Sequence, residues 1–345
     1  MTNQFFFQKR VILPFIFLFV VFNAAIGYSV PKPNIPDSGT GYALLIGVND
    51  YDNDGNKARA KEANRPFFNL PNLNYCCNDM IGIGEALVSG QFTKQENIVI
   101  LTSNAKDDDK KPTLVNIDRE LKNLLAKLKP VDTVFIAFSG SGCVLPDYEG
   151  DEKGELYLCP MDAEIFCSPK TGKFDCRRLI SRNDIVTQLQ DSEAGIKIFV
   201  MDTCRNRDIV TRSIAQTELV EKTTLEFFPV FVKGCLFQLF SCAEEQTGAE
   251  SAELEHGIYS YFMIKGLKGA ANSNNDRYIS LSELQRYIQK MTSDYAKEVL
   301  KHEQTPKIVA ICDRIGEDIV ITRLISPPLP NGNIRPVIPP NRRTR

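Results

Sequence analysis

Histidine is scarce in this chain, because only His256 and His302 occur among its 345 residues. Two short polar motifs that end apolar runs contain Ser141 and Cys204 but no histidine. Both histidines follow Cys204 in the sequence, so neither lies in the earlier motif, where an imidazole could serve as base for a later thiol. The sequence therefore offers a candidate nucleophile without the usual candidate base.

A marked excess of charge of either sign is also absent. The formal net charge is −2 and the isoelectric point is near 5.9. Nucleic-acid-binding proteins usually carry a clear basic excess, so the charge argues against nucleic acid as a partner. The chain is 43% hydrophobic and 24% charged, as globular proteins are. A body of this size can bury roughly three quarters of its unfolded surface, so one sizeable core is expected.

The N-terminal segment lacks the length of a typical membrane span. Residues 11–22 are apolar, follow Lys9 and Arg10, and precede the small residues Ala25 and Gly27. A span needs about 20 apolar residues, whereas a short apolar block after a positive end predicts a cleaved signal peptide over residues 1–27. The protein would then be secreted or lie in the endomembrane lumen. An uncleaved anchor formed by residues 11–27 is the alternative.

No Asn-x-Ser/Thr sequon occurs, which weakly disfavours a glycosylated surface protein. Cysteine, in contrast, is well represented. Cys167 and Cys176 flank a turn that a disulfide could close, whereas Cys235 and Cys242 lie in an apolar run, where free cysteine acts as a small hydrophobe. These two interpretations leave the redox compartment open. The ten cysteines are at positions 76, 77, 143, 159, 167, 176, 204, 235, 242 and 312.

Apolar strand-like runs alternate with helical periodicity along most of the chain. Strands are expected at residues 42–47, 97–101, 133–138, 196–201, 235–242, 307–311 and 318–322. Helices are expected at residues 78–87, 114–128, 258–267 and 282–300, and a further helix is expected to be capped by Ser181. Continuous apolar strands that alternate with helices predict an α/β fold whose mainly parallel sheet is covered on both faces.

The two polar motifs, residues 138–142 and 202–206, follow the third and fourth of these strands. Sites in parallel sheets form just beyond the carboxyl ends of the strands, so both motifs belong to one candidate site. After a Pro/Gly/Ser-rich leader at residues 28–40, the folded domain is expected over residues 41–322. It consists of a large segment (41–212), an irregular loop (213–233) and a small segment (234–322). The Pro/Arg-rich residues 323–345 are expected to form a disordered tail, although they contain a PxxP spacing.

Several landmarks in fixed order resemble the caspase and metacaspase family (peptidase C14) of cysteine endopeptidases. The likeness covers residues 41–322 and implies a three-layer α/β/α sandwich with a larger and a smaller segment. It rests on the motifs YALLIGV (42–48), LNYCCND (73–79), FSGSG (138–142), LCPMD (158–162), DTCRN (202–206), HGIYSY (256–261) and QTP (304–306).

The resemblance implies roles for several residues. Cys204 would be the nucleophile, Ser141 occupies the position of the general-base histidine, and the Gly142 backbone would contribute to the oxyanion hole. The metacaspase-like branch also implies an acidic pocket for a substrate Arg or Lys. The residues matching that pocket are Cys76, Asp79, Ser139 and Asp202. The alternative for the two acids is structural, with Asp79 capping a helix and Asp202 holding a strand-end turn.

The serine at position 141 separates two hypotheses about function. A pseudopeptidase would keep the Cys204 thiol and the acidic pocket and act as a regulator or binding module for an Arg- or Lys-bearing peptide or protein, with an active caspase-like relative as a further partner. A working endopeptidase that cleaves after Arg or Lys would need an unusual base or one supplied by a partner. His256 is expected to serve as a core or cap residue and His302 to end a solvated helix, so neither replaces the base.

No cofactor is required by this chemistry, although calcium could bind. Metacaspase-like proteins are often calcium-activated, but the equivalent stretch here has Asn183 and Asp184, one acid short. The acid-rich loop 147–155 offers further carboxylates. Residues 272–283 match an EF-hand loop in part, but Arg277 replaces the required glycine, so a polar turn before a helix is the better interpretation.

Overall fold

The protein is described by a computed structural model over residues 39–52, 55, 57, 58, 61, 69–145, 155–167, 174–205, 233–244, 246–312 and 318–324. The predicted signal or anchor segment, nearly all of the leader, the loop 213–233 and the tail lie outside these residues, apart from a few flanking positions. Among the described residues, no helix combines the length and the apolar character needed to cross a lipid bilayer.

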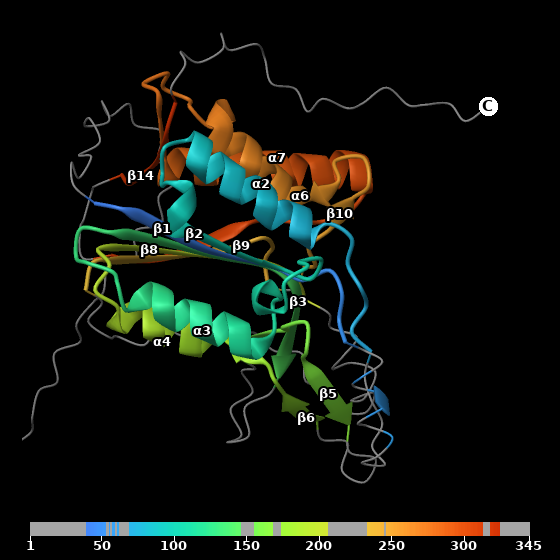
Figure 1. The fold of residues 1–345 in the computed structure, drawn as a ribbon. Helices are drawn as coiled ribbons and strands as arrows, with labels where there is room; N and C mark the ends of the chain where they lie inside the picture. Colours follow the sequence, from blue (N-terminus) through green and yellow to red (C-terminus); the bar gives the residue numbers. More distant parts are fainter. Residues whose placement is uncertain are drawn as a thin grey trace, which may run out of the picture. The chain divides into compact units, whose positions relative to one another are not determined.

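A mainly parallel sheet forms the centre of the fold (Figure 1). Within the described residues it contains β1 (Gly41–Gly47), β2 (Ile98–Thr102), β3 (Thr133–Leu145), β4 (Glu155–Leu158), β7 (Ile180–Ser181), β8 (Ile196–Arg205), β9 (Cys235–Phe240) and β13 (Lys307–Cys312). The main path runs β13-β9-β8-β3-β1-β2. Pairings from β9 to β2 are parallel, whereas β13 is antiparallel to β9, and β4 to both β3 and β7.

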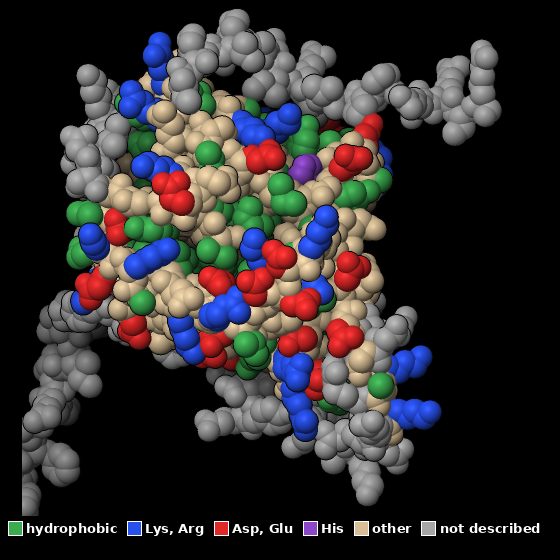
Figure 2. Space-filling model, viewed as in Figure 1, with side chains coloured by type: hydrophobic (Ala, Val, Ile, Leu, Met, Phe, Trp, Pro, Cys, Tyr) green, Lys and Arg blue, Asp and Glu red, His purple; other side chains and the backbone are tan. Residues whose placement is uncertain are grey.

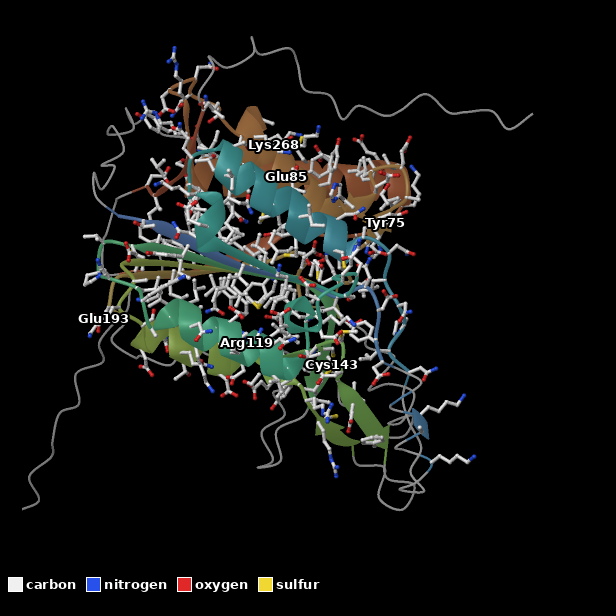
Figure 3. The ribbon with its side chains drawn as sticks, in the orientation of Figure 1. Tyr75, Glu85, Arg119, Cys143, Glu193 and Lys268 are labelled. Carbon is white, nitrogen blue, oxygen red and sulfur yellow. A yellow bond between two sulfur atoms is a disulfide. The ribbon has the colours of Figure 1, made fainter. Side chains whose placement is uncertain are left out.

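Helices cover both faces of this sheet (Figure 1). On one face lie α2 (Cys76–Ser89), α6 (Ile258–Lys265) and α7 (Leu281–Tyr295); on the other lie α3 (Leu114–Leu125) and α4 (Arg182–Asp191). The turns η3 (Gly266–Ala270) and η4 (Ala296–Leu300) extend α6 and α7. Lys268 of η3 reaches Glu85 of α2 at 3.7 Å within one helical layer (Figure 3). The predicted three-layer α/β/α sandwich is therefore confirmed.

Alternating residues of β3 build the two cores. Val134, Ile136 and Phe138 pack into the apolar cluster that includes residues of α3 and α4. Phe135 and Ala137 pack into the cluster that includes residues of α2, α6 and α7. Because side chains on a strand point alternately to the two faces, a fully apolar strand must be covered on both sides. The central strands therefore hold the two helical layers together.

Side-chain caps fix where three helices begin. The hydroxyls of Thr113 and Ser181 accept hydrogen bonds from the backbone N–H groups of Asn116 and Asp184, at the starts of α3 and α4. At α7, the hydroxyl of Ser280 and the carboxylate of Glu283 form a reciprocal capping box. These contacts satisfy N–H groups that the helices themselves leave free. The predicted starts at Ser181 and at the Ser280 segment are confirmed.

Short strand pairs complete the described fold. They are β5 (Glu164–Cys167) with β6 (Phe174–Arg177), β10 (Glu250–Ser251) with β11 (His256–Gly257), and β12 (Tyr278–Ser280) with β14 (Val320–Arg323); the turns η1 (Gln95–Asn97) and η2 (Asp108–Lys110) flank β2. The last predicted strand thus pairs outside the central sheet. On the molecular face in Figure 2, basic and acidic side chains are interspersed.

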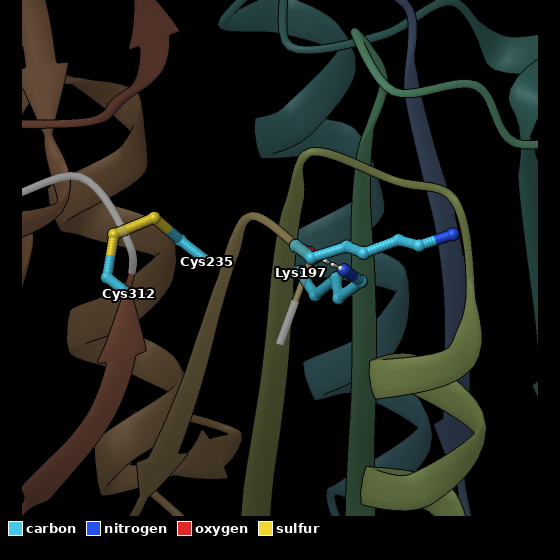
Figure 4. Close-up of a disulfide and its surroundings, with 4 residues drawn as sticks. Lys197, Cys235 and Cys312 are labelled. Atoms are coloured by element: carbon cyan, nitrogen blue, oxygen red, sulfur yellow. Dashed lines mark hydrogen bonds between the residues drawn. A yellow bond between two sulfur atoms is a disulfide. The ribbon is translucent and has the colours of Figure 1, made fainter. Parts of the chain in front are cut away.

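The structure corrects the prediction that Cys235 is a free apolar cysteine. Cys235 at the start of β9 lies opposite Cys312 at the end of β13, and the two form a disulfide (Figure 4). Antiparallel pairing places the two side chains on the same side of neighbouring strands, at a Cα–Cα distance of 4.1 Å. Cys242 is buried, and its Sγ lies 3.2 Å from the Gln246 carbonyl oxygen.

The other proposed disulfide falls partly outside the described residues. The hairpin of β5 and β6 contains both cysteines, but Cys167 lies opposite Phe174, and Cys176 lies opposite Ile165. The side chain of Cys167 is not among the described ones. A bond between Cys167 and Cys176 therefore stays a prediction.

Candidate functional site

The two polar motifs lie side by side at the carboxyl end of the central sheet. In the parallel register of β3 and β8, Ser139 pairs with Asp202, and Ser141 pairs with Cys204. The sequence predicted strands that end at residues 138 and 201, whereas both continue, to Leu145 and Arg205. The extension has a physical reason, because the motif residues hydrogen-bond across the sheet, and β4 folds back onto β3. The position of the Cys204 thiol lies outside the described part of the structure.

Ser141 is fully buried and tightly held by its backbone. Its N–H donates to the phenol oxygen of Tyr51 at 2.6 Å, and its carbonyl accepts from the N–H of Cys159 at 3.0 Å. Its hydroxyl makes no hydrogen bond of normal geometry within the described residues. Burial raises the pKa of Tyr51 well above the usual value, so this phenol is a poor proton donor.

Two buried cysteines, Cys143 and Cys159, lie next to Ser141 in this part of the sheet (Figure 3 labels Cys143). The pKa of Cys143 is raised by its hydrogen bond with Cys159 and by burial. Thiolates are the reactive form of cysteine, so such thiols behave as apolar side chains.

Gly142 lies inside the sheet, whereas the sequence predicted that it would follow the end of a strand. It has Leu158 of β4 on one side and Arg205 of β8 on the other. A Cβ at this position would lie 3.2 Å from the side chain of Thr203, closer than most side-chain contacts. The glycine therefore allows close approach of the neighbouring strands, while its predicted oxyanion role stays a prediction.

Asp79 and Ser139, two of the residues matched to the basic-residue pocket, are in direct contact. The Ser139 hydroxyl on β3 donates to Asp79 Oδ2 on α2 at 3.1 Å. The other oxygen, Oδ1, accepts from the backbone N–H of Gly257 at 3.1 Å and lies 2.8 Å from His256 Nδ1. Asp79 is only 1% exposed. Its carboxylate is thus held from three elements, α2, β3 and β11.

Asp202 brings a second carboxylate to the same place. The Ser260 hydroxyl on α6 donates to Asp202 Oδ2 at 2.6 Å. A Cβ added to Gly257 would lie 3.0 Å from Asp202 Oδ2 and 3.1 Å from Asp79 Oδ2. The two carboxylates therefore converge on the bare Cα of one glycine. These residues are all buried, and we call Asp79, Asp202, Ser139, Ser260 and Gly257 the acidic pocket after the role that the sequence predicted for the two acids.

Burial raises the pKa of both carboxyl groups and so disfavours their ionised forms. The pKa of Asp79 is raised to about 7 by burial and by the neighbouring Asp202, against the lowering effect of its hydrogen bond to His256. Burial also raises the pKa of Asp202, against the lowering effect of the hydrogen bond from Ser260. A positive group placed between the two would favour their charged forms, and two carboxylates could each contribute a few kcal/mol at an effective dielectric of about 20. The chemistry of the pocket therefore suits a cation.

Both acids also accept hydrogen bonds from residues at the start of α6. Asp79 lies in the first turn of α2 without capping that helix, and its oxygens accept from Ser139 of β3 and from Gly257, the N-cap residue of α6. Glu250 of β10 instead accepts from the N–H groups of Asn74 and Tyr75 just before α2, at 3.0 and 2.8 Å (Figure 3 labels Tyr75). Asp202 accepts from Ser260 of α6, and the turn that it was expected to hold lies outside the described residues, so that role stays a prediction. Cys76 is buried at the start of α2, with its Sγ 4.0 Å from Glu250 Oε1.

Glu250, Gly257 and Ser260 were not singled out from the sequence as site residues. They come from β10, β11 and α6, which follow the predicted loop 213–233 and carry no motif that indicates an acid-binding role. The sequence did mark the HGIYSY stretch that contains two of them. His256 was assigned to the core or to a cap, whereas its ring contacts Asp79. His302 Nε2 lies 2.7 Å from the Thr247 carbonyl oxygen, and neither residue belongs to the acidic pocket.

No group of three or more His, Cys, Asp or Glu side chains is arranged to hold a metal ion within the described ranges. In the EF-hand-like stretch, Asp276 accepts from the N–H of Tyr278, and Glu283 serves the α7 capping box. This supports the polar turn before a helix. Asp184 lies in the first turn of α4, and most of the acid-rich loop 147–155 lies outside the described residues. Calcium binding was not predicted from the sequence, and the described residues do not test it.

Comparison with known proteins agrees with this geometry. The sequence profile of the caspase domain (peptidase C14) matches residues 40–314. This chain belongs to the caspase family. Among curated relatives, metacaspase-1 of Eremothecium gossypii is 32% identical over 129 residues, 37% of this chain and 25% of that protein. Metacaspase-1B of Aspergillus clavatus is 34% identical over 126 residues, 36% of this chain and 27% of that protein. The matched part is about a quarter of each of these metacaspases.

Solved structures support the caspase fold. Caspase-1 from Spodoptera frugiperda superposes with a TM-score of 0.50 at 11% identity, covering 87% of this chain and 99% of that one. Protein GSU0716 from Geobacter sulfurreducens gives a TM-score of 0.54 at 14% identity, covering 83% and 99%. Identities this low speak for the fold alone. The family resemblance and the α/β sandwich expected from the sequence are confirmed.

Proposed function

We propose that this caspase-family protein is a pseudopeptidase, which binds a peptide or protein through an Arg or Lys side chain and hydrolyses peptide bonds weakly or not at all. It would act as a regulator or binding module, with an active caspase-like relative among its partners. One observation carries the proposal. Asp79 and Asp202 converge on Gly257, while the residue across the sheet from Cys204 is Ser141.

The loss of histidine affects two chemical steps unequally. A thiol with a pKa near 8.5 is roughly 3% thiolate at pH 7, so attack by Cys204 would slow only by tens of fold. The departing amine must also be protonated, and a serine hydroxyl is far too weak an acid for that step. Positioned acid–base groups contribute ~10²–10⁴ in rate. Binding by the pocket requires neither step.

Restoring the base tests the proposal. The full chain should release no measurable amine from a fluorogenic Arg or Lys peptide amide, and Ser141→His should create turnover at least ~10²-fold above the wild-type background. Adding Cys204→Ala should abolish the gain, and Ser141→Asn, polar but not basic, should show none. Cys204-dependent hydrolysis by the wild-type chain would contradict the proposal.

Because position 141 is buried, Ser141→His could disturb folding, so a second measurement uses the wild-type chain. Iodoacetamide should alkylate Cys204 with a rate that rises around pH 8.5, as for a thiol without an activating base. Mass spectrometry of the Cys204 peptide gives this rate. A midpoint well below pH 7 would reveal an activating group and overturn the proposal.

The second candidate function is an active cysteine endopeptidase that cleaves after Arg or Lys. The retained Cys204 and the converging acids favour it, because an active enzyme of this specificity needs both. The sequence between Arg205 and Lys233 contains several Arg and Lys residues. Self-cleavage there by the purified protein with calcium, absent in Cys204→Ala, would select this candidate, whereas an intact chain under those conditions supports the pseudopeptidase.

We further propose that residues 1–27 direct the chain into the secretory pathway as a cleaved signal. The Cys235–Cys312 disulfide supports an oxidising compartment, since such bonds are rare in the cytosol. The intact mass of the protein purified from its native source should lack residues 1–27. A mass that retains them would instead favour a membrane anchor or a different location.

A further inference from the structure

His256 links the small segment to the acidic pocket. It lies on β11, opposite Ser251 of β10, and β11 leads directly into α6. Its Nδ1 lies 2.8 Å from Asp79 Oδ1. The neighbouring N–H of Gly257 donates to the same oxygen at 3.1 Å. One short strand thus delivers both contacts to a single carboxylate oxygen, which leaves Oδ2 directed at Ser139 and Asp202.

The surroundings of the imidazole make Asp79 its main ionic neighbour. The His256 side chain is 21% exposed, whereas that of Asp79 is 1% exposed. From α6, the ring of Tyr261 lies 6.1 Å from the imidazole, centroid to centroid, and carries Lys265 above it. Besides Asp79, the ionisable groups near the adjoining Gly257 are Asp202 of β8 and, as the strand partner of this glycine, Glu250 of β10, and Glu255 precedes His256 in the sequence. The imidazole therefore lies between solvent and the deepest acid of the pocket.

We propose that His256 is a positioning residue of the acidic pocket: its contact with Asp79 keeps that carboxylate ionised and turned toward Asp202, and so sets the pH at which the pocket takes up a guanidinium or ammonium group. This inference rests on the proposed binding of a basic side chain. It adds the group that controls such binding.

The physical reason is a competition at Asp79. Burial and the proximity of Asp202 favour the protonated acid, and the hydrogen bond and charge of His256 oppose them, with the balance near pH 7. A cationic ligand needs the ionised carboxylate, so below this pH each binding event must expel a proton. Affinity then rises about tenfold per pH unit below the pKa and levels off above it. Without the imidazole, the whole profile moves to higher pH.

Calorimetric titration of the full chain with benzamidine, a small aryl amidine cation, tests this from pH 6 to pH 9. Wild-type affinity should increase about tenfold between pH 6 and pH 8, with about one proton released per ligand near pH 6. His256→Ala should move the midpoint upward, so that the variant binds severalfold more weakly than wild type at pH 7 and approaches it at pH 9. His256→Asn, whose amide can still donate to Asp79 Oδ1, should lie between them.

The chain provides a matched control and a second readout. His302→Gln removes the only other histidine, which contacts Thr247, and should leave the profile unchanged. With two histidines, the proton spectrum contains two Hε1 resonances, and each variant assigns one. Benzamidine added at pH 6.5 should shift the His256 resonance, because its partner Asp79 loses a proton on binding, and leave that of His302 in place.

The outcomes separate this inference from the proposed function. If benzamidine binds and His256→Ala keeps the wild-type pH profile, the role of His256 is wrong, while the binding function stands. If a folded wild-type chain binds no benzamidine at any pH, the acidic pocket does not bind a cation, and the proposed binding function is wrong as well. If affinity is constant from pH 6 to pH 8, no proton is linked to binding, and the inference is again overturned.

Discussion

Ser141 of β3 and Cys204 of β8 are direct neighbours across the central sheet, although they are far apart in the sequence. Neighbouring strands lie roughly 4.8 Å apart, so a side chain at position 141 starts next to the backbone of Cys204. Serine supplies a hydroxyl there that neither takes nor gives a proton near neutral pH. This cross-strand pair is therefore where the proposed pseudopeptidase and an active endopeptidase would differ.

Replacing Asp79 with Asn should stabilise the protein at high pH. The folded-state pKa of Asp79 is raised from 3.8 to about 7, so the folded state binds the extra proton between these values. Below pH 4 the protonated Asp79 therefore contributes its full stabilisation. As the pH rises to 7 and above, this contribution to the free energy of unfolding is lost, by about 4 kcal/mol at most. Asparagine avoids this loss while keeping an acceptor for the Gly257 N–H.

Denaturant unfolding of wild type and Asp79→Asn at pH 4.5 and pH 8 gives the comparison. The difference in the free energy of unfolding should grow in favour of Asn between the two pH values. An equal difference at both would show that Asp79 titrates normally. The same variant should lose benzamidine binding, because one of the two converging charges is gone.

Gly257→Ala should block the acidic pocket with little loss of stability. Its backbone conformation suits alanine, but the added Cβ would lie 3.0 Å from Asp202 Oδ2 and 3.1 Å from Asp79 Oδ2. A methyl group in this space excludes a cation and leaves two crowded acids. We expect at least a tenfold loss of benzamidine affinity and a fall of roughly 1 kcal/mol in stability.

A matched substitution nearby controls for stability. At Gly248 an added Cβ would meet its nearest atoms, among them Asp202 Oδ1, at 3.6 Å or more, an ordinary contact distance. Thermal unfolding should therefore rank Gly248→Ala above Gly257→Ala. A folded Gly257→Ala protein with full benzamidine affinity would place the cation elsewhere.

Ser280→Ala should lower the free energy of unfolding by about 1 kcal/mol. The hydroxyl of Ser280 accepts from the N–H of Glu283, and the Glu283 carboxylate accepts from the N–H of Ser280. Loss of an N-cap hydroxyl typically costs this amount. Glu283→Gln keeps a capping-box side chain and should cost less. Chemical denaturation of the three proteins measures the difference, and no loss in Ser280→Ala would mean that packing alone fixes the start of α7.

Cys312→Ser should destabilise the protein by roughly 4 kcal/mol under oxidising conditions. The Cys235–Cys312 bond closes a loop with a sequence separation of 77, and the entropy lost by the unfolded chain grows with loop length. Reduction of the wild-type protein should lower its stability toward that of the variant. Non-reducing peptide mapping should find the linked peptide two hydrogens lighter than its separate parts, and two free thiols in the mapped native protein would exclude the bond.

The sequence predicted most of the layered architecture. Fully apolar strands such as residues 42–47 and 133–138, and capped amphipathic helices such as that after Ser181, have local signals that tertiary packing reinforces. Strand ends were less predictable. The FSGSG and DTCR stretches look like loops, yet they continue β3 and β8 because each strand satisfies the backbone of the other.

The acidic pocket was only half predictable. Asp79, Ser139 and Asp202 lie in motifs of the large segment, so the family resemblance identified them. Gly257 matters because it has no side chain, and Ser260 matters because α6 faces β8, and neither property is visible in local sequence. The Cys235–Cys312 bond was also missed, because the antiparallel pairing of β9 with β13 joins segments that are distant in the sequence and is not visible in local sequence.

The acidic pocket is built from residues on both sides of the predicted loop 213–233, with Asp79 and Asp202 before it in the sequence and Gly257 and Ser260 after it. The six-residue parallel register between β8 and β9 joins the same two sides. A chain cut within this loop would therefore give two bands on a denaturing gel. In size-exclusion chromatography the two parts should still elute together, with the proposed cation site intact. Separation of the two halves, and not scission itself, is what would end ligand capture.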